Sequence, residues 1–146
     1  MPTRKARTEW SGGLQDGSGR VELVSSGVGT YDVSFPRRSA DSAGGVTSPE
    51  ELIAAAHTSC YAMQLSALLG DAGGTINRLT VEAEVGLGPD EDAGGFKITG
   101  IALTVRGDVD GVDADGFRQA AESAKVGCPV SKALAAVDIT LDAALA

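Results

Sequence analysis

A long helical pattern between residues 48 and 69 constrains the fold of this chain more than any other feature. Ser48 and Glu51 have the spacing of a capping box, and Pro49 suits the first helical position. At about 1.5 Å per residue, this helix is predicted to be roughly 30 Å long. Apolar residues cover it on nearly all sides, and one broad face consists of Leu52, Ile53, Ala56, Cys60, Met63 and Ala67. A helix of this kind must be covered on most sides, so we expect a dimer in which a second subunit helps to bury it.

Alternating polar and apolar residues predict strands on both sides of this helix. Strands are expected at residues 6–10, 20–24, 31–35, 76–87, 96–105 and 138–142, and two further helices at 113–127 and 129–136. The glycines of residues 26–30 predict a hairpin loop, and Gly127 is expected as a left-handed residue that ends the second helix. This order predicts an α+β fold with antiparallel sheet around a central buried helix. Without an internal repeat or a linker, residues 1–146 are expected to form a single domain.

The charge and composition of the chain disfavour several classes of function. A formal net charge of -8 without a basic stripe disfavours nucleic acid and anionic membranes as partners. No apolar run follows the charged first residues, and no stretch approaches the roughly 18 continuous apolar residues of a membrane span. We therefore expect a soluble, cytoplasmic protein. In that reducing compartment, two cysteines favour catalysis, metal binding or plain packing over a structural disulfide.

The second of the two cysteines, Cys128, falls at the predicted start of the third helix. Unpaired N–H groups and the helix dipole lower the pKa of a thiol at that position. A small residue that fills a tight buried corner explains Cys128 equally well. The local sequence favours neither a reactive Cys128 nor a purely structural one.

Cys60 lies in the middle of the long helix, without a helix terminus nearby. Burial there raises a thiol pKa, so a reactive Cys60 needs a cation from another part of the chain. Arg37 and Arg38, in a loop shortly before the helix, are the expected suppliers. Glu50 or Glu51 could hold such an arginine, although acidic residues in a first turn are also ordinary capping chemistry.

His57, the only histidine, precedes Cys60 by one helical turn and leaves three alternatives open. A Cys–His pair could support acyl transfer, although no oxyanion loop or third partner stands out. A metal site could join His57, Cys60 and Cys128 with one carboxylate, which is a weak zinc signature. The interpretation we favour is a packing or supporting role for His57 next to the chemistry.

Two cysteine motifs, at residues 48–60 and 127–131, resemble those of the OsmC/Ohr thiol peroxidases (osmotically inducible protein C and organic hydroperoxide resistance proteins). Residues 8–12 and 139–142 are similar to the osmotically inducible branch in particular. This resemblance covers nearly the whole chain. It implies the OsmC-like α+β fold, in which antiparallel sheets wrap around a long central helix, and an intertwined homodimer with each active site at the subunit interface.

The resemblance also implies roles for individual residues. Cys60 corresponds to the peroxidatic thiol and Cys128 to the resolving thiol. The activating arginine of the family lies just after the third strand, and Arg37 is chosen over Arg38 because it follows Phe35 by two residues. Glu50 matches the glutamate that binds this arginine.

The implied reaction is the reduction of alkyl or lipid hydroperoxides to alcohols. Cys60 becomes a sulfenic acid, Cys128 closes a disulfide with it, and an external dithiol, lipoyl-type by resemblance, reopens the disulfide. No metal and no bound organic cofactor are implied. From another class, a redox-sensing or small-ligand binding module without enzymatic activity is the main alternative.

Overall fold

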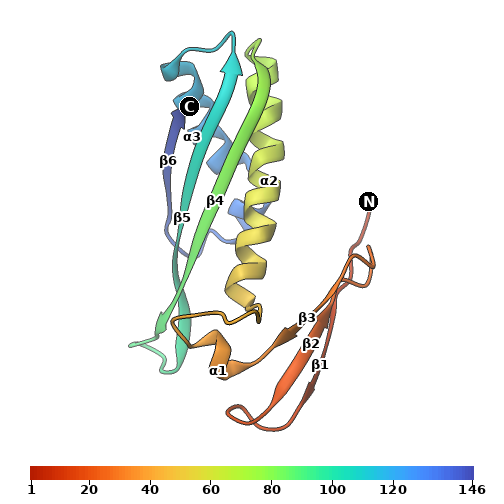
Figure 1. Ribbon diagram of the computed structural model, residues 1–146. Helices are drawn as coiled ribbons and strands as arrows, with labels where there is room; N and C mark the ends of the chain where they lie inside the picture. Colours follow the sequence, from red (N-terminus) through yellow and green to blue (C-terminus); the bar gives the residue numbers. More distant parts are fainter. The chain divides into compact units, whose positions relative to one another are not determined.

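The computed structural model describes all residues from Met1 to Ala146. The chain divides into two compact units, residues 1–52 and 53–146, and each unit holds one three-stranded sheet (Figure 1). The predicted α+β class is confirmed. The expectation of a single domain over the whole chain stays a prediction.

The first unit begins with an antiparallel sheet in which neighbouring strands follow each other along the chain. Its strands are β1 (Arg7–Ser11), β2 (Ser18–Glu22) and β3 (Thr30–Val33), in that order. The predicted hairpin loop lies between β2 and β3, where Gly27 has a φ of 68° and the N–H of Leu23 donates to the carbonyl of Gly29. A residue without Cβ suits that φ, which explains the glycine in this turn.

A short helix that the sequence did not predict follows the third strand. α1 (Phe35–Arg38) contains both arginines, which were expected in a loop after a strand ending at Phe35. Ser34 is its N-cap, and the side chain of Ser34 accepts a hydrogen bond from the N–H of Arg37. Pro36 in the first turn fits the same start because its fixed φ is already helical. The strand prediction was therefore too long, and a serine–proline helix start ends it.

The long helix α2 (Pro49–Asp71) confirms the main prediction. The hydroxyl of Ser48 accepts the N–H of Glu51 at 3.1 Å, as a capping box requires. The carboxylate of Glu51 does not return to Ser48 but accepts from the hydroxyl of Thr47. The helix ends where Gly73 adopts a φ of 84°, which permits a left-handed turn.

The second unit consists of the longer part of α2, a second sheet and two further helices. The remaining elements are β4 (Thr75–Pro89), β5 (Phe96–Asp110), α3 (Ala114–Gly127), α4 (Pro129–Ala133) and β6 (Ile139–Leu145). β4 and β5 form an antiparallel hairpin, as predicted, but β6 pairs with β5 in parallel. The expectation of antiparallel pairing is wrong for this strand. The reason is the α3–α4 connection, since a helical crossover returns the chain in its original direction.

The junction of α3 and α4 differs from the prediction in one detail. Asp113 caps α3 as expected, and its side chain accepts the N–H of Gly116 at 2.8 Å. Gly127, however, is the last helical residue and not a left-handed terminator. Cys128 itself, with a φ of −58°, is the residue that both ends α3 and begins α4.

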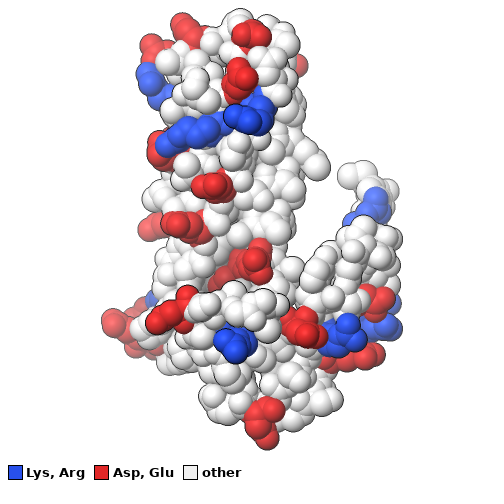
Figure 2. All heavy atoms as spheres, viewed as in Figure 1, with Lys and Arg blue, Asp and Glu red and all other residues white.

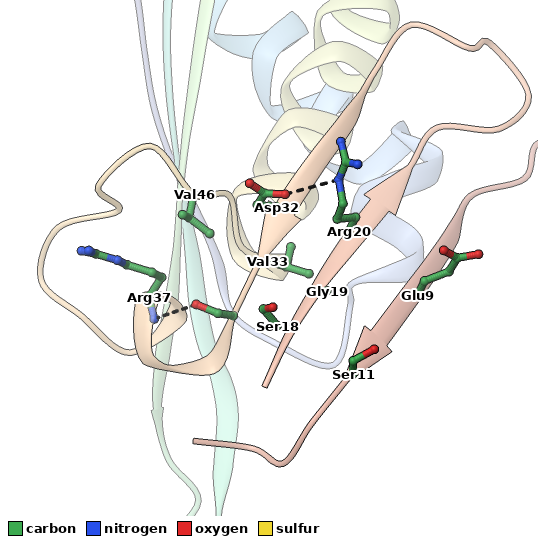
Figure 3. A pocket seen from close by; sticks show the side chains of 10 residues that line it. Glu9, Ser11, Ser18, Gly19, Arg20, Asp32, Val33, Arg37 and Val46 are labelled. Atoms are coloured by element: carbon green, nitrogen blue, oxygen red, sulfur yellow. Dashed lines mark hydrogen bonds and ion pairs between the residues drawn. The ribbon is translucent and has the colours of Figure 1, made fainter. Parts of the chain in front are cut away.

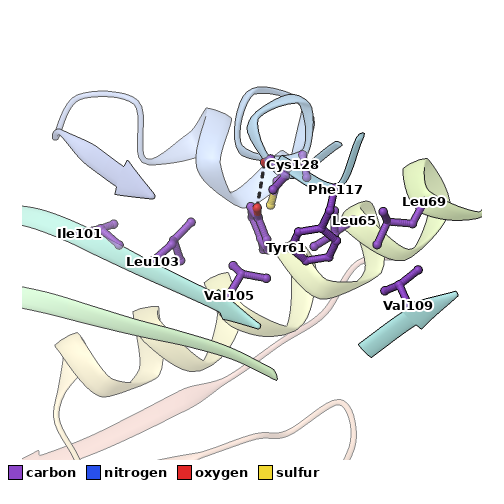
Figure 4. Packing of buried hydrophobic residues seen from close by; sticks show 11 residues of the cluster. Tyr61, Leu65, Leu69, Ile101, Leu103, Val105, Val109, Phe117 and Cys128 are labelled. Carbon is purple, nitrogen blue, oxygen red and sulfur yellow. Dashed lines mark hydrogen bonds between the residues drawn. The ribbon is translucent and has the colours of Figure 1, made fainter. Parts of the chain in front are cut away.

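A core of apolar side chains fills the second unit between α2, β5 and α3 (Figure 4). Its fully or nearly fully buried members are Tyr61, Leu65, Leu69, Ile101, Leu103, Val105, Val109, Phe117, Ala121, Ala124 and Cys128. The α2 residues recur every four positions, and the β5 residues every two, as a helix face and a strand face require. Within its own unit, α2 thus buries the face that begins at His57 and exposes Met63 of the broad apolar face.

The other side of α2 is apolar and uncovered. Met63 is 71% exposed, and no charged residue occurs from Leu52 to Gly70. In the view of Figure 2, the acidic and basic side chains lie away from the white surface of this helix. α2 is the one helix long and apolar enough to cross a membrane by length and composition, yet 22% of its most apolar stretch is already buried in the protein. A core helix that is buried on one side and apolar on the other passes the same test.

Candidate active site

The two free thiols, Cys60 and Cys128, both lie in the second unit and act on each other. Cys60 comes from the middle of α2 and is partly exposed. Cys128 comes from the α3–α4 junction and is 0% exposed. Figure 4 shows Cys128 beside Tyr61, the neighbour of Cys60 along α2. The fold therefore brings together two cysteines that are far apart in the sequence, one open to reactants and one closed.

The surroundings of the two thiols shift their pKa values in opposite directions. Burial raises the pKa of the Cys60 thiol, and the adjacent Cys128 raises it further, while the backbone N–H of Val130 opposes both. Burial also acts to raise the pKa of Cys128, but the backbone N–H of Ser131, the thiol of Cys60 and the side chain of Ser131 outweigh it and lower that pKa. Both directions agree with the local argument from sequence. By itself, the second unit makes Cys128 the better thiolate and leaves Cys60 in need of a cation.

An arginine–carboxylate pair in the first unit joins α1 to the start of α2. Arg38 donates to the carboxylate of Glu50 from Nε at 3.0 Å and from Nη2 at 2.7 Å, and these two bonds make a bidentate ion pair. Glu50 is only 8% exposed. Burial acts to raise the pKa of its carboxyl, but the hydrogen bonds and charge of Arg38 outweigh burial and lower it.

The predicted partner of Glu50 was Arg37, and that pairing is wrong. Successive residues of a helix point about 100° apart, so α1 can direct only one of its two arginines at Glu50. Arg37 lies over the loop that follows, where a Cβ added to Gly44 would come within 2.7 Å of its Nη1. It lines a polar groove of about 590 Å³ on the first unit, together with Glu9, Arg20 and Asp32 (Figure 3). Arg38 is therefore the arginine that a glutamate holds in place.

Arg38 also lines a more apolar hollow of about 390 Å³ on the first unit. Trp10, Leu14, Phe35 and Leu52 contribute to its walls. A guanidinium at the border of an apolar surface can bind an oxygen while the remainder of the bound molecule contacts hydrocarbon. This combination suits a small molecule with an apolar body and a polar end.

His57 is fully buried and bonds to a residue that the sequence argument did not single out. Its Nε2 lies 2.7 Å from Oγ of Ser131, and its Nδ1 has no partner. Burial lowers the pKa of the ring. His57 thus supports the structure beside the thiols, as we favoured, and does not pair with Cys60. Ser131 stands three residues after a cysteine at a helix start, but this spacing does not indicate its contact with His57.

The remaining alternative from the sequence was a metal site built on His57, Cys60 and Cys128. No group of three or more His, Cys, Asp or Glu side chains in the chain is arranged to hold a metal ion. The hydrogen bond between His57 and Ser131 also occupies one of the two ring nitrogens. The geometry therefore favours thiol chemistry at this site over metal binding.

Known proteins with similar sequences match most of this chain. The OsmC-like protein family matches residues 42–142, which include both cysteines. The chain is 41% identical over 139 residues to peroxiredoxin OsmC of Escherichia coli (strain K12), covering 95% of this chain and 94% of that protein. It is 32% identical over 127 residues to the organic hydroperoxide resistance protein OhrB of Bacillus subtilis (strain 168), covering 85% and 90%.

Solved structures of organic hydroperoxide resistance proteins have a similar fold over nearly the whole chain. The crystal structure of an organic hydroperoxide resistance protein from Elizabethkingia anophelis superposes with a TM-score of 0.80 at 26% identity, covering 100% of this chain and 98% of that one. An organic hydroperoxide resistance protein OsmC from Legionella pneumophila gives a TM-score of 0.78 at 26% identity, covering 99% and 98%. The likeness therefore extends over both units of the chain.

Proposed function

The chain belongs to the OsmC-like family of thiol peroxidases, and we propose that it reduces organic hydroperoxides to alcohols with Cys60 as the attacking thiol. The observation that carries this proposal is the contact between a partly exposed Cys60 and a buried Cys128. A relative 41% identical over nearly the whole chain is named a peroxiredoxin, and another relative is named for organic hydroperoxide resistance. Detoxification of hydroperoxides is the role that both names share.

The proposed reaction has two steps on the protein. The Cys60 thiolate attacks the terminal peroxide oxygen, an S–O bond forms, the O–O bond breaks, and the alkoxide takes up a proton to leave as the alcohol. The Cys128 thiolate then attacks the sulfur of the Cys60 sulfenic acid. An S–S bond forms, the S–O bond breaks, and hydroxide leaves as water after protonation. Rapid closure of this disulfide protects Cys60 from further oxidation.

Arg38, held by Glu50, is the cation that we propose for Cys60. The raised pKa of Cys60 means that attack near neutral pH requires such a cation. Arg38 binds Glu50 through Nε and Nη2. Its Nη1 is therefore left for a peroxide oxygen or for the thiolate of Cys60. The apolar hollow beside Arg38 favours alkyl or lipid hydroperoxides over hydrogen peroxide. Equal catalytic efficiency on hydrogen peroxide and cumene hydroperoxide would contradict that preference.

The reductant, the assembly and the compartment follow as further parts of the proposal. An external dithiol, lipoyl-type or a small molecule, attacks the disulfide and is itself oxidised to a disulfide, so no resident metal or organic cofactor takes part. A second copy of the chain covers the exposed apolar side of α2 in a homodimer. The cytoplasm is the compartment that keeps such a dithiol reduced.

Mass spectrometry after one equivalent of cumene hydroperoxide tests the central assignment. We expect the loss of two hydrogen atoms and a Cys60–Cys128 crosslink in the wild-type chain. In Cys128→Ser, dimedone is expected to trap a sulfenic acid at Cys60. Full peroxidase activity in Cys60→Ser would show that the attacking thiol has been assigned wrongly.

A further inference from the structure

The buried pair of His57 and Ser131 links α2 to α4 directly behind the thiols. The two side chains are 0% and 4% exposed, and 2.7 Å separates Nε2 from Oγ. Residues 74 positions apart in the chain meet here in a buried position. Buried polar pairs cost folding energy unless each member is hydrogen-bonded, so the direction of this bond matters.

The unpartnered Nδ1 of His57 fixes that direction. Burial lowers the pKa of the ring, so the ring is neutral near pH 7 and carries one N–H. A buried N–H without an acceptor is rarer in proteins than a buried acceptor without a donor. The proton therefore lies on Nε2 and the bare nitrogen is Nδ1. Nε2–H donates to Ser131 Oγ, which leaves the hydroxyl hydrogen of Ser131 free to be donated elsewhere.

The acceptor that the start of α4 offers for that hydrogen is the sulfur of Cys128. Cys128 is the N-cap of α4 and Ser131 its third residue, two positions whose side chains face each other at a helix start. The backbone N–H and the side chain of Ser131 both act to lower the pKa of the Cys128 thiol. The titratable groups facing this sulfur are Cys60 and Tyr61, both from α2. The hydroxyl of Tyr61 is already donated to the carbonyl of Ala121, so it does not compete.

We propose that His57 and Ser131 form a fixed relay of hydrogen bonds, from Nε2–H through the serine hydroxyl to Cys128, which prepares Cys128 to attack and to leave. His57 and Ser131 are positioning residues, and His57 stays neutral throughout. The catalytic consequence rests on the proposed peroxidase function. When Cys128 attacks the sulfenic acid, the relay raises the fraction of Cys128 present as thiolate.

The same relay selects the sulfur that the external dithiol attacks. Cys60 is partly exposed and Cys128 is not, so one thiolate of the dithiol bonds to Cys60. The S–S bond breaks and Cys128 departs as a thiolate that Ser131 stabilises, since a leaving thiol of lower pKa leaves faster. The second thiolate of the dithiol then attacks the mixed disulfide, closes the oxidised dithiol and releases Cys60.

Titration of the Cys128 thiol, followed by its ¹³Cβ chemical shift as a function of pH, tests the relay without peroxide and without a reagent that must reach the buried sulfur. In a Cys60→Ser background, Ser131→Ala and His57→Phe are each expected to move the titration profile of Cys128 to higher pH. Ser131→Thr keeps a hydroxyl and His57→Gln keeps an N–H donor, and both should restore much of the profile. Ser66→Ala on α2 is the matched control, because the hydroxyl of Ser66 bonds only to the carbonyl of Met63. An unchanged profile in a folded Ser131→Ala protein overturns the proposal.

Nitrogen NMR of the wild-type chain gives a test that needs no variant. His57 is the only histidine, so labelling with ¹⁵N-histidine reports this ring alone. We expect a neutral ring with the proton on Nε2 and a bare Nδ1 at pH 7. A proton on Nδ1, or a charged ring at that pH, overturns the relay. Neither measurement depends on peroxidase activity, so failure of the relay and failure of the proposed function are distinguishable.

Single-turnover kinetics connect the relay to catalysis. In Ser131→Ala, closure of the Cys60–Cys128 disulfide after a pulse of peroxide should slow roughly tenfold, as the loss of a hydrogen bond to a charged group predicts. The first step, oxidation of Cys60, should keep its rate. Slowing of both steps by the same factor would indicate a general structural defect and contradict the assignment.

Discussion

Arg38 binds Glu50 through two nitrogens of one guanidinium, and the neighbouring Arg37 does not reach this carboxylate. The pair ties α1 to the first turn of α2. A fixed guanidinium loses less side-chain entropy when it binds a substrate, and its direction is set before the substrate arrives. Glu50 thus fixes the side chain of Arg38, while Arg37 lines the polar groove.

Replacement of each arginine by alanine separates the two roles. Arg38→Ala should lower kcat/KM for an organic hydroperoxide by roughly 10- to 100-fold, the loss expected for a hydrogen bond to a charged group. Arg37→Ala should stay within about threefold of wild type, because it removes no contact with Glu50. Steady-state assays with cumene hydroperoxide and a dithiol check both. The opposite ranking would return the activating role to Arg37.

The lowered pKa of Glu50 predicts how folding stability depends on pH. The folded state binds the proton of this carboxyl less readily than the unfolded chain does, so the Arg38–Glu50 pair contributes its full stability above the ordinary pKa of 4.5. This contribution is lost as the pH falls through the lower folded-state pKa. Urea unfolding of wild type and Glu50→Gln at several pH values measures it. The difference in unfolding free energy should shrink as the pH falls below 4.5, and a constant difference would contradict the prediction.

The sequence predicts those helices, strands and site residues that have a recognisable local pattern, such as a capping residue or a glycine-rich end. α2 was predicted almost to the residue, because Ser48, Pro49 and a glycine-rich end mark its limits. α1 was missed, since four residues are too few to show a helical period, and the choice of arginine depended on it. The direction of β6 was missed because an alternating pattern is the same for parallel and antiparallel pairing. Ser131 was missed because its importance comes from a contact with His57 across the fold.

The exposed side of α2 predicts a homodimer that a single charge can disrupt. Met63 is 71% exposed on an uncharged helix face, whereas Leu65, two residues further on, is fully buried in the core. Met63→Glu should shift the protein from dimer to monomer in sedimentation velocity without unfolding the second unit. A dimer that survives Met63→Glu unchanged would show that this face lies outside the subunit interface.

Leu65→Ala is the matched change on the buried side of the same helix. It should lower the free energy of unfolding by about 2–5 kcal/mol, through lost burial and the cavity left behind. Its effect should appear in urea unfolding and should be the same at all protein concentrations that keep the oligomeric state constant. An effect below about 1 kcal/mol would mean that the core around Leu65 can collapse onto the space.

The close packing of Phe117 against β5 predicts that one glycine of this strand cannot be replaced. A Cβ at Gly107 would come within 2.4 Å of Cε2 and 2.6 Å of Cζ of Phe117, and this ring is fully buried. Gly107→Ala should therefore destabilise the protein by about 1–3 kcal/mol, the usual cost of overpacking a core. Gly100→Ala in the same strand is the control, because its Cβ would meet only the carbonyl oxygen of Asp138 at 3.5 Å. Thermal unfolding checks this ranking. Equal stabilities for Gly107→Ala and Gly100→Ala would mean that the Phe117 ring can move aside and that α3 packs less closely on β5.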